Sequence, residues 1–206
     1  WATTSNCNIT GVTDTAPTGL TQDFGNFTWN CTGQTAFVYF IEALRTVNGN
    51  FTVDNTHNGV SVFGLFLAET NNSTYTLNVV GDLIINVAQL FMVYGQGDNF
   101  FGDNVTGTVN VGGNFSMSGA NSYFHYWPVF ATGTGLSLNK LRLNVTGNYS
   151  QAGGIFNFCA GSSDTPNYTE LNLTGNLSFT GGVMESSTLD PDITNGRITF
   201  NNSGNQ

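Results

Sequence analysis

Hydrophobic and polar residues alternate along much of the chain with a period of two. In one segment Leu141, Leu143, Val145 and Tyr149 share a face, and the residues between the first three are polar. This alternation predicts β-strands with one buried face, because successive side chains of a strand point to opposite sides. A helical pattern is met only weakly, around residues 37–44. The pattern therefore predicts an all-β protein.

A Gly-Asn dipeptide, once Gly-Asp, recurs at intervals of 24 to 34 residues. Glycine beside asparagine suggests a bend with either a close backbone approach or a positive φ. A large apolar residue follows two positions later in the first six copies, so stacked repeats would place these residues in one column. The glycines are Gly25, Gly49, Gly81, Gly113, Gly147, Gly175 and Gly204.

Repeats of this length cannot bury their apolar faces alone, but they can do so by stacking. We therefore predict a parallel β-helix (β-solenoid) with about six coils of roughly 30 residues. An antiparallel sandwich is the alternative, although it leaves the matched corners unexplained. Residues 1–35 are predicted to form an irregular N-terminal cap or entry segment, and residues 36–206 the solenoid. Residues 198–205 begin a further coil, so we expect the natural chain to continue or another molecule to cover that end.

Charge narrows the choice of partners. Only 8% of the residues are charged, and 13 acids against four bases give a net charge of −9. Nucleic-acid binding needs clusters of Lys and Arg, and the sequence contains none, so we do not expect the chain to bind nucleic acid. Binding to an anionic membrane is disfavoured for the same reason. No apolar run approaches the ~20 residues of a transmembrane helix. Neutral polar residues dominate instead, with 28 Asn, 28 Thr and 26 Gly.

The best copies of the repeat read L-N-V-T-G-N-Y-S (residues 143–150) and L-N-L-T-G-N-L-S (171–178), each followed a few residues later by Gly-Gly. They resemble the β-helix repeats of large cell-surface proteins of Bacteroidota, which the type 9 secretion system typically exports. The resemblance implies an extracellular, adhesin-like or structural protein whose partners are other surface or secretion proteins, or glycans. Asp14-Thr15-Ala16 looks like the O-glycosylation motif of that phylum, which makes Thr15 a candidate glycosylation site.

Catalysis is not expected. Parallel β-helices include polysaccharide lyases and glycoside hydrolases, and hydrolases need converging carboxylates. Here the acids are scattered, and the four bases do not align with acids at the repeat spacing. Two alternatives stay open beside a non-catalytic module. One is a filament subunit that self-associates end to end, and the other is a carbohydrate-active enzyme.

Two segments carry candidate binding residues. Residues 122–130 concentrate aromatic side chains at both strand parities, so Tyr123, Tyr126 and Trp127 are candidates for stacking on a ligand. The alternative is an insertion whose aromatic side chains pack against the rod. Asp98 and Asp103 lie in a Gly/Asp/Asn-rich loop that offers oxygen ligands for Ca²⁺, although such loops are more often plain turns. No other cofactor is predicted.

Cysteine and asparagine suggest two covalent features. Cys7 and Cys31 could form a disulfide if the N-terminal segment folds back, which leaves Cys159 as a buried thiol. Asn-x-Ser/Thr sequons predict a glycoprotein, unless the asparagines serve the corners and the sequons follow from composition. The candidates are Asn8, Asn26, Asn30, Asn50, Asn71, Asn72, Asn104, Asn114, Asn144, Asn148, Asn167, Asn172, Asn176 and Asn201.

Overall fold

The computed structural model describes residues 1–2, 4–56, 63–68, 73–93, 106–125, 140–161, 168–188 and 196–201. Strands are the only regular elements in these ranges, so the described chain has no helix that could cross a membrane. The strands are β1 (Asn6–Thr10), β2 (Asn26–Asn30), β3 (Val38–Tyr39), β4 (Thr46–Val47), β5 (Phe51–Asn55), β6 (Gly64–Ala68), β7 (Thr74–Val79), β8 (Leu83–Val87), β9 (Gln89–Val93), β10 (Thr106–Val111), β11 (Phe115–Met117), β12 (Tyr123–His125), β13 (Lys140–Val145), β14 (Tyr149–Gly161), β15 (Tyr168–Leu173), β16 (Leu177–Thr188) and β17 (Gly196–Phe200).

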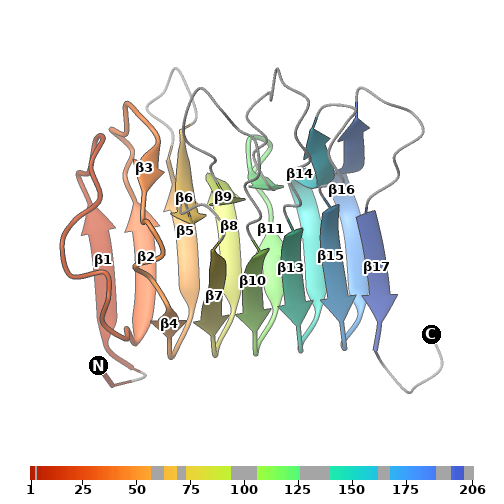
Figure 1. The fold of residues 1–206 in the computed structure, drawn as a ribbon, viewed down its shortest axis with the longest axis horizontal. Helices are drawn as coiled ribbons and strands as arrows, with labels where there is room; N and C mark the ends of the chain where they lie inside the picture. Colours follow the sequence, from red (N-terminus) through yellow and green to blue (C-terminus); the bar gives the residue numbers. More distant parts are fainter. Residues whose placement is uncertain are drawn as a thin grey trace.

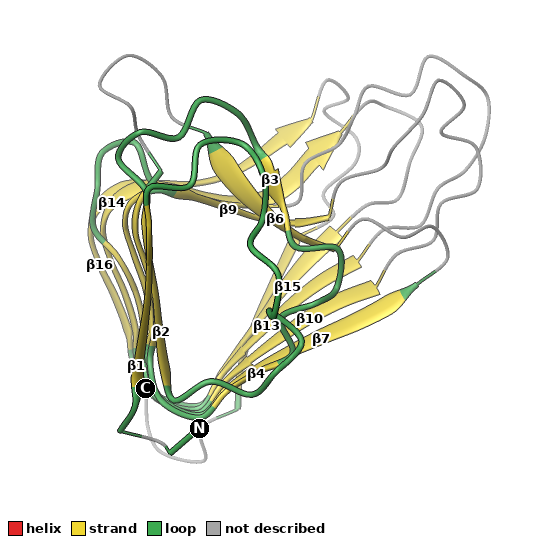
Figure 2. Ribbon diagram, turned by 90° about the vertical axis from the view of Figure 1, so that its left-hand side faces the viewer, coloured by secondary structure: helices red, strands yellow, loops and turns green. Residues whose placement is uncertain are grey.

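These strands form two parallel sheets (Figure 1). The smaller has six strands in the order β17-β15-β13-β10-β7-β4. The larger has eleven, and its long strand β14 pairs with β11 through its first half and with β12 through its second. Viewed along the long axis, the sheets enclose a triangular section, and the larger one bends over two of its sides (Figure 2). The fold is thus all-β and parallel, which excludes the antiparallel sandwich.

The predicted apolar column is confirmed. Its members are register partners on neighbouring strands of the larger sheet. Ring centroids of Phe115 and Tyr149 lie 4.9 Å apart in a stacked arrangement, and Phe27 meets Phe51 edge-on at 5.6 Å. Each residue is therefore buried mainly by its counterparts in adjacent repeats. The column consists of Phe27, Phe51, Leu83, Phe115, Tyr149 and Leu177.

The Gly-Asn corners lie directly on top of one another. Each glycine N–H donates to the carbonyl of the preceding corner glycine, at 2.8 to 3.1 Å from Gly49 to Gly175. A Cβ on Gly113 would lie 2.8 Å from the Gly81 carbonyl oxygen, closer than side chains pack. Close approach, and not a positive φ, explains these glycines.

The corner asparagines form a second ladder beside the glycines. Each side-chain oxygen accepts a hydrogen bond from the backbone N–H of its counterpart in the next repeat, as from Asn148 to Asn114 at 2.9 Å. Asp82 takes the same role and accepts from the backbone and side-chain nitrogens of Asn114. We call this series the corner ladder: Asn26, Asn50, Asp82, Asn114, Asn148 and Asn176.

Residues 1–35 are more regular than the sequence suggested. They contain β1 and β2, which pair in register with each other, and β2 pairs with β5 of the following repeat. Trp29 is fully buried, and its indole N–H donates to the Gln34 side-chain oxygen at 3.1 Å. The larger sheet therefore crosses the boundary predicted at residue 35.

The end formed by β16 and β17 differs from the interior. Leu177 and Phe179 continue the apolar pattern of the larger sheet, yet they are 37% and 47% exposed, and Phe200 on β17 is 42% exposed. Tyr149, one repeat earlier in the same column, is fully buried. This difference arises because no described strand pairs with the outer edge of β16 or β17.

Candidate binding face

The outer side of the six-stranded sheet carries a regular array of polar side chains. Apolar residues of its strands point into the core, so alternation turns the intervening Thr and Asn residues outward. Asn78, Asn110, Asn144 and Asn172 are register partners on β7, β10, β13 and β15. Each side-chain NH₂ donates to the side-chain oxygen of the preceding asparagine at 2.8 to 2.9 Å. We call these four residues the face ladder.

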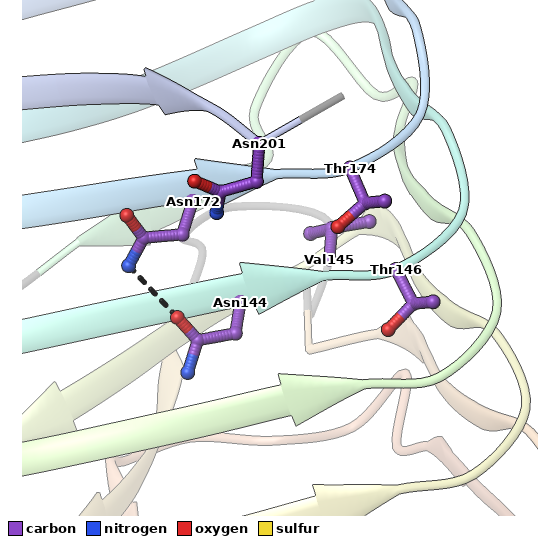
Figure 3. Close-up of a pocket in the computed structure, with 6 residues that line it drawn as sticks. All are labelled: Asn144, Val145, Thr146, Asn172, Thr174 and Asn201. Carbon is purple, nitrogen blue, oxygen red and sulfur yellow. Dashed lines mark hydrogen bonds between the residues drawn. The ribbon is translucent and has the colours of Figure 1, made fainter. Parts of the chain in front are cut away.

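Two adjoining hollows follow the face ladder. One is lined by Asn78, Asn110, Asn144 and Thr146 together with the apolar residues Val79, Val80 and Val111 and with Gly112. The other is shown in Figure 3 and is lined by Asn144, Val145, Thr146, Asn172, Thr174 and Asn201. Both hollows are lined by Asn144 and Thr146, so the second hollow continues the first across neighbouring strands of the sheet. Amide and hydroxyl groups of this kind can both donate and accept hydrogen bonds.

Charged side chains lie beside the second hollow. Glu170 on β15 is the register partner of Arg142 on β13 and of Arg197 on β17. Its oxygens lie 2.7 Å from Arg142 Nε and 2.5 Å from an Arg197 terminal nitrogen. The prediction that no base aligns with an acid at the repeat spacing is therefore wrong. The separation of 28 residues between Arg142 and Glu170 equals the interval from Gly147 to Gly175, which was the signal in the sequence. The separation of 27 residues between Glu170 and Arg197 is two shorter than the interval from Gly175 to Gly204, so the sequence did not indicate it.

The predicted aromatic site is described only in part. Tyr123 lies on β12, where its backbone pairs with Gln89 and Ile155, and its side chain is half-buried. Tyr126 and Trp127 lie outside the described residues. The adjacent Phe124 is buried and stacks on Phe156 with ring centroids 5.4 Å apart. The structure thus leaves the three-residue ligand site as a prediction.

The candidate Ca²⁺ ligands Asp98 and Asp103 also lie outside the described residues. Within the part of the chain that is described, no three His, Cys, Asp or Glu side chains gather into a possible metal site. Thr15 is exposed between β1 and β2, and its hydroxyl donates to the Asp14 carboxylate at 3.1 Å. Its glycosylation stays a prediction.

The predicted disulfide between Cys7 and Cys31 is not formed. Cys7 pairs in register with Phe27, so Cys31 is displaced from it by four residues, about 13 Å along parallel strands. Disulfides need Cα atoms within about 7 Å. Instead, the Cys31 thiol donates to the Ile9 carbonyl oxygen at 3.6 Å. Burial raises the pKa of both thiols, which keeps them protonated and weakly reactive. The side chain of Cys159 is outside the description.

Half of the sequon asparagines belong to the two ladders. In the face ladder the NH₂ group of Asn144 and of Asn172 donates to its neighbour, and this nitrogen is the atom that N-glycosylation modifies. The ladders therefore give these asparagines a structural reason that is independent of any glycan. The ladder sequons are Asn26, Asn50, Asn114, Asn144, Asn148, Asn172 and Asn176.

Comparison of the chain with protein-family models, curated protein sequences and solved structures gave no match. The resemblance of the repeats to surface proteins of Bacteroidota accordingly stays a prediction.

Proposed function

We propose that the chain is a parallel β-solenoid of about six coils that serves as a non-catalytic structural or adhesive module of a secreted or cell-surface protein. The observation that carries the proposal is the unbroken corner ladder, in which glycine and asparagine, once aspartate, repeat in register from β2 to β16. Such a ladder gives every repeat the same attachment to the next, as in repeat proteins that act as extended scaffolds. The extracellular location follows from the resemblance of the repeats to surface proteins.

Three of the described acidic side chains make contacts between repeats, and these contacts support a non-catalytic role. Asp82 belongs to the corner ladder, and Asp54 accepts a hydrogen bond from the Asn86 side chain at 2.8 Å. Glu170 is held between Arg142 and Arg197. Carboxylates engaged in contacts between repeats hold the repeats together and are not arranged as the facing pair of a glycosidase.

Surface labelling tests the proposed location and role. Antibodies raised against the folded chain are applied to intact and to lysed cells of the source organism. We expect equal labelling of both, whereas labelling only after lysis would overturn an extracellular role. A parallel assay for reducing ends and unsaturated sugars, run on neutral and acidic polysaccharides, tests the enzyme alternative. Turnover that survives repurification would establish it.

Self-association through the ends is a second candidate function, and one observation favours it. The larger sheet exposes Leu177 and Phe179 on β16, whose outer edge pairs with no described strand. Within the described residues the last rung of the corner ladder is at Asn176, and at the other end of the sheet the Asn6 side-chain oxygen accepts from the Asn26 side chain at 2.9 Å. A second copy could continue both the ladder and the apolar column by strand addition.

Sedimentation of a concentration series tests this second function. Head-to-tail contacts do not close, so we expect a progression of species and not a single dimer. Phe179→Asp should abolish the progression, because it places a charge in the new interface. Val80→Asp is the matched control, since Val80 is equally apolar and 59% exposed away from that end. A monomer at all concentrations, or equal loss in both variants, would contradict end-to-end assembly.

A further inference from the structure

The first hollow, which follows Asn78, Asn110 and Asn144, lies over the interior of the six-stranded sheet. Its strands β7, β10 and β13 each pair with a described strand on both sides. The residues that line it are all uncharged, and the same holds for the second hollow. A ligand that fits these hollows is therefore held by neutral hydrogen bonds and by apolar contact, and not by ion pairs.

The amides of the face ladder retain hydrogen-bonding capacity for a ligand. A side-chain amide has two N–H donors and an oxygen with two lone pairs. Asn110 and Asn144 each donate once to the preceding asparagine and accept once from the following one. Beyond these bonds to described residues, each amide has one N–H and one lone pair left. Because the ladder already fixes the orientation of these groups, little conformational entropy is lost when a ligand binds them.

Gly112 forms the floor of the first hollow. The residue directly before the corner glycine is Val80 in the preceding repeat, Gly112 in this one and Thr146 in the next. Val80 and Thr146 are therefore about 10 Å apart, which is two strand spacings, and no side chain stands between them. The Val80 side chain is 59% exposed. A sugar ring suits such a gap, because its C–H groups can pack on valine methyl groups while its hydroxyls meet the Thr146 hydroxyl.

The two hollows together favour an extended ligand. The second hollow continues from Asn144 and Thr146 to Asn172 and Thr174 (Figure 3). Along this line the face ladder offers one amide per strand, about every 4.8 Å. A β-1,4-linked chain of pyranose rings has a matching form, because it is straight and advances by about one strand spacing per ring. An α-1,4-linked chain coils away from a flat face, and a peptide strand would pair with a sheet edge instead.

We propose that the two hollows and the face ladder bind a neutral, β-1,4-linked polysaccharide whose chain runs across β7, β10, β13 and β15. One ring lies over Gly112, and the amides of Asn110 and Asn144 exchange hydrogen bonds with its hydroxyls and with those of the next ring. This inference rests on the adhesive role proposed above and deepens it by naming the class of ligand and its site. It uses neither the predicted aromatic residues nor a metal ion.

Calorimetric titration of the full chain with cellohexaose, chitohexaose and maltohexaose tests the inference. We expect one or both β-linked hexasaccharides to bind and the α-linked maltohexaose not to bind. Affinity should stay unchanged as salt rises, because no ion pair is formed. The corresponding β-linked disaccharide should bind about tenfold more weakly, since it cannot reach both hollows and forgoes one or two hydrogen bonds. Binding of neither β-linked hexasaccharide, equal binding of maltohexaose, or an affinity that falls steeply with salt would overturn the proposal.

Two matched substitutions locate the site. Thr146→Val removes a hydroxyl that lines both hollows and leaves shape and charge almost unchanged, so it should weaken binding of the hexasaccharide about fivefold, the loss expected for one neutral hydrogen bond. Thr52→Val is the control, because Thr52 lies on the outer side of β5 in the larger sheet, and it should leave affinity unchanged. Unchanged affinity in Thr146→Val, or equal weakening by both substitutions, would contradict a site on the six-stranded sheet. Thr174→Val provides a second variant in the hollow, with a similar expected loss, should Thr146→Val fail to fold.

Failure of this inference is distinguishable from failure of the proposed function. Surface labelling tests where the protein lies and does not depend on any sugar, whereas the titrations use the purified chain and do not depend on its location. A protein that is labelled on intact cells but binds none of the hexasaccharides would refute the site alone. A protein that binds a β-linked hexasaccharide but is labelled only after lysis would refute the extracellular role alone.

Discussion

The middle of the stack and its β16–β17 end contain the same sequence pattern but differ in burial. Phe115 and Tyr149 are fully buried, whereas Leu177, which occupies the same column, is 37% exposed. The alternation is equally regular in both regions, so the difference comes from neighbours along the axis. In this fold a residue's own strand decides which way it points, and the next repeat decides whether it is covered.

The largest effect that would test this comparison is on the stability of the core. Phe115→Ala should cost about 3–5 kcal/mol of unfolding free energy, since it removes a side chain packed against Tyr149 and Phe124. Phe179→Ala should cost roughly 1 kcal/mol, because that ring is already half exposed. Equilibrium urea denaturation measures both. Equal losses would show that the β16 end is covered in solution.

The close approach at the corners should give the next largest effect. Gly113→Ala places a Cβ 2.3 Å from an Asp82 side-chain oxygen and 2.8 Å from the Gly81 carbonyl, and should cost about 1–3 kcal/mol. Gly33→Ala is the control, because nothing lies within 4 Å of its added Cβ. We expect that control to stay within about 0.5 kcal/mol of the wild type. A neutral Gly113→Ala would mean that the corners are not tightly stacked.

Removing one rung of the corner ladder should have a smaller effect. Asn114→Ala deletes the acceptor for the Asn148 N–H and should lower stability by about 1 kcal/mol. Among the described residues none donates a hydrogen bond to the Asn176 side-chain oxygen, so Asn176→Ala should leave the unfolding free energy nearly unchanged. Thermal unfolding of the two variants side by side measures the difference. A larger loss at Asn176 would indicate that its side chain meets a partner.

The smallest effect near neutral pH concerns the buried tyrosines. Burial raises the pKa of Tyr149 and of Tyr75, whose hydroxyl donates to the Leu44 carbonyl. Each therefore ionises more readily in the unfolded chain, where its pKa is about 10. Stability should be unaffected below about pH 10 and should fall as pH rises above it. Tyr149→Phe should reduce this slope, and an unchanged slope in urea titrations between neutral and alkaline pH would contradict it.

Much of the fold could be predicted from the sequence because the pattern is local. Alternation predicts that Leu143 and Val145 face the core. The position of each large apolar residue after Gly-Asn predicts the column through Phe115. The corner glycines needed one further fact, since the sequence left open whether they serve a close approach or a positive φ. Backbone contact between Gly81 and Gly113 decides for close approach.

The ion pairs of Glu170 and the absence of the disulfide depend on the register between neighbouring strands. The sequence does not determine this register where the repeat interval changes. Arg142, Glu170 and Arg197 meet because their strands pair at separations of 28 and 27 residues, shorter than the 32 to 34 residues of earlier repeats. Cys7 and Cys31 do not meet, because the pairing of β1 with β2 places Cys7 opposite Phe27, four residues before Cys31. Both outcomes require knowing which residues are opposite each other on neighbouring strands.

The constancy of the corners has a consequence for how the protein can vary. Successive corner glycines are separated by 24 to 34 residues, yet the N–H to carbonyl distance between them stays within 2.8 to 3.1 Å. Added or deleted residues are therefore accommodated away from the corners, and the alignment of the rungs does not change. Segments between the strands can diverge or be exchanged, while the axis keeps one geometry. The stacked corners can thus stay unchanged while the segments between them vary in length and sequence.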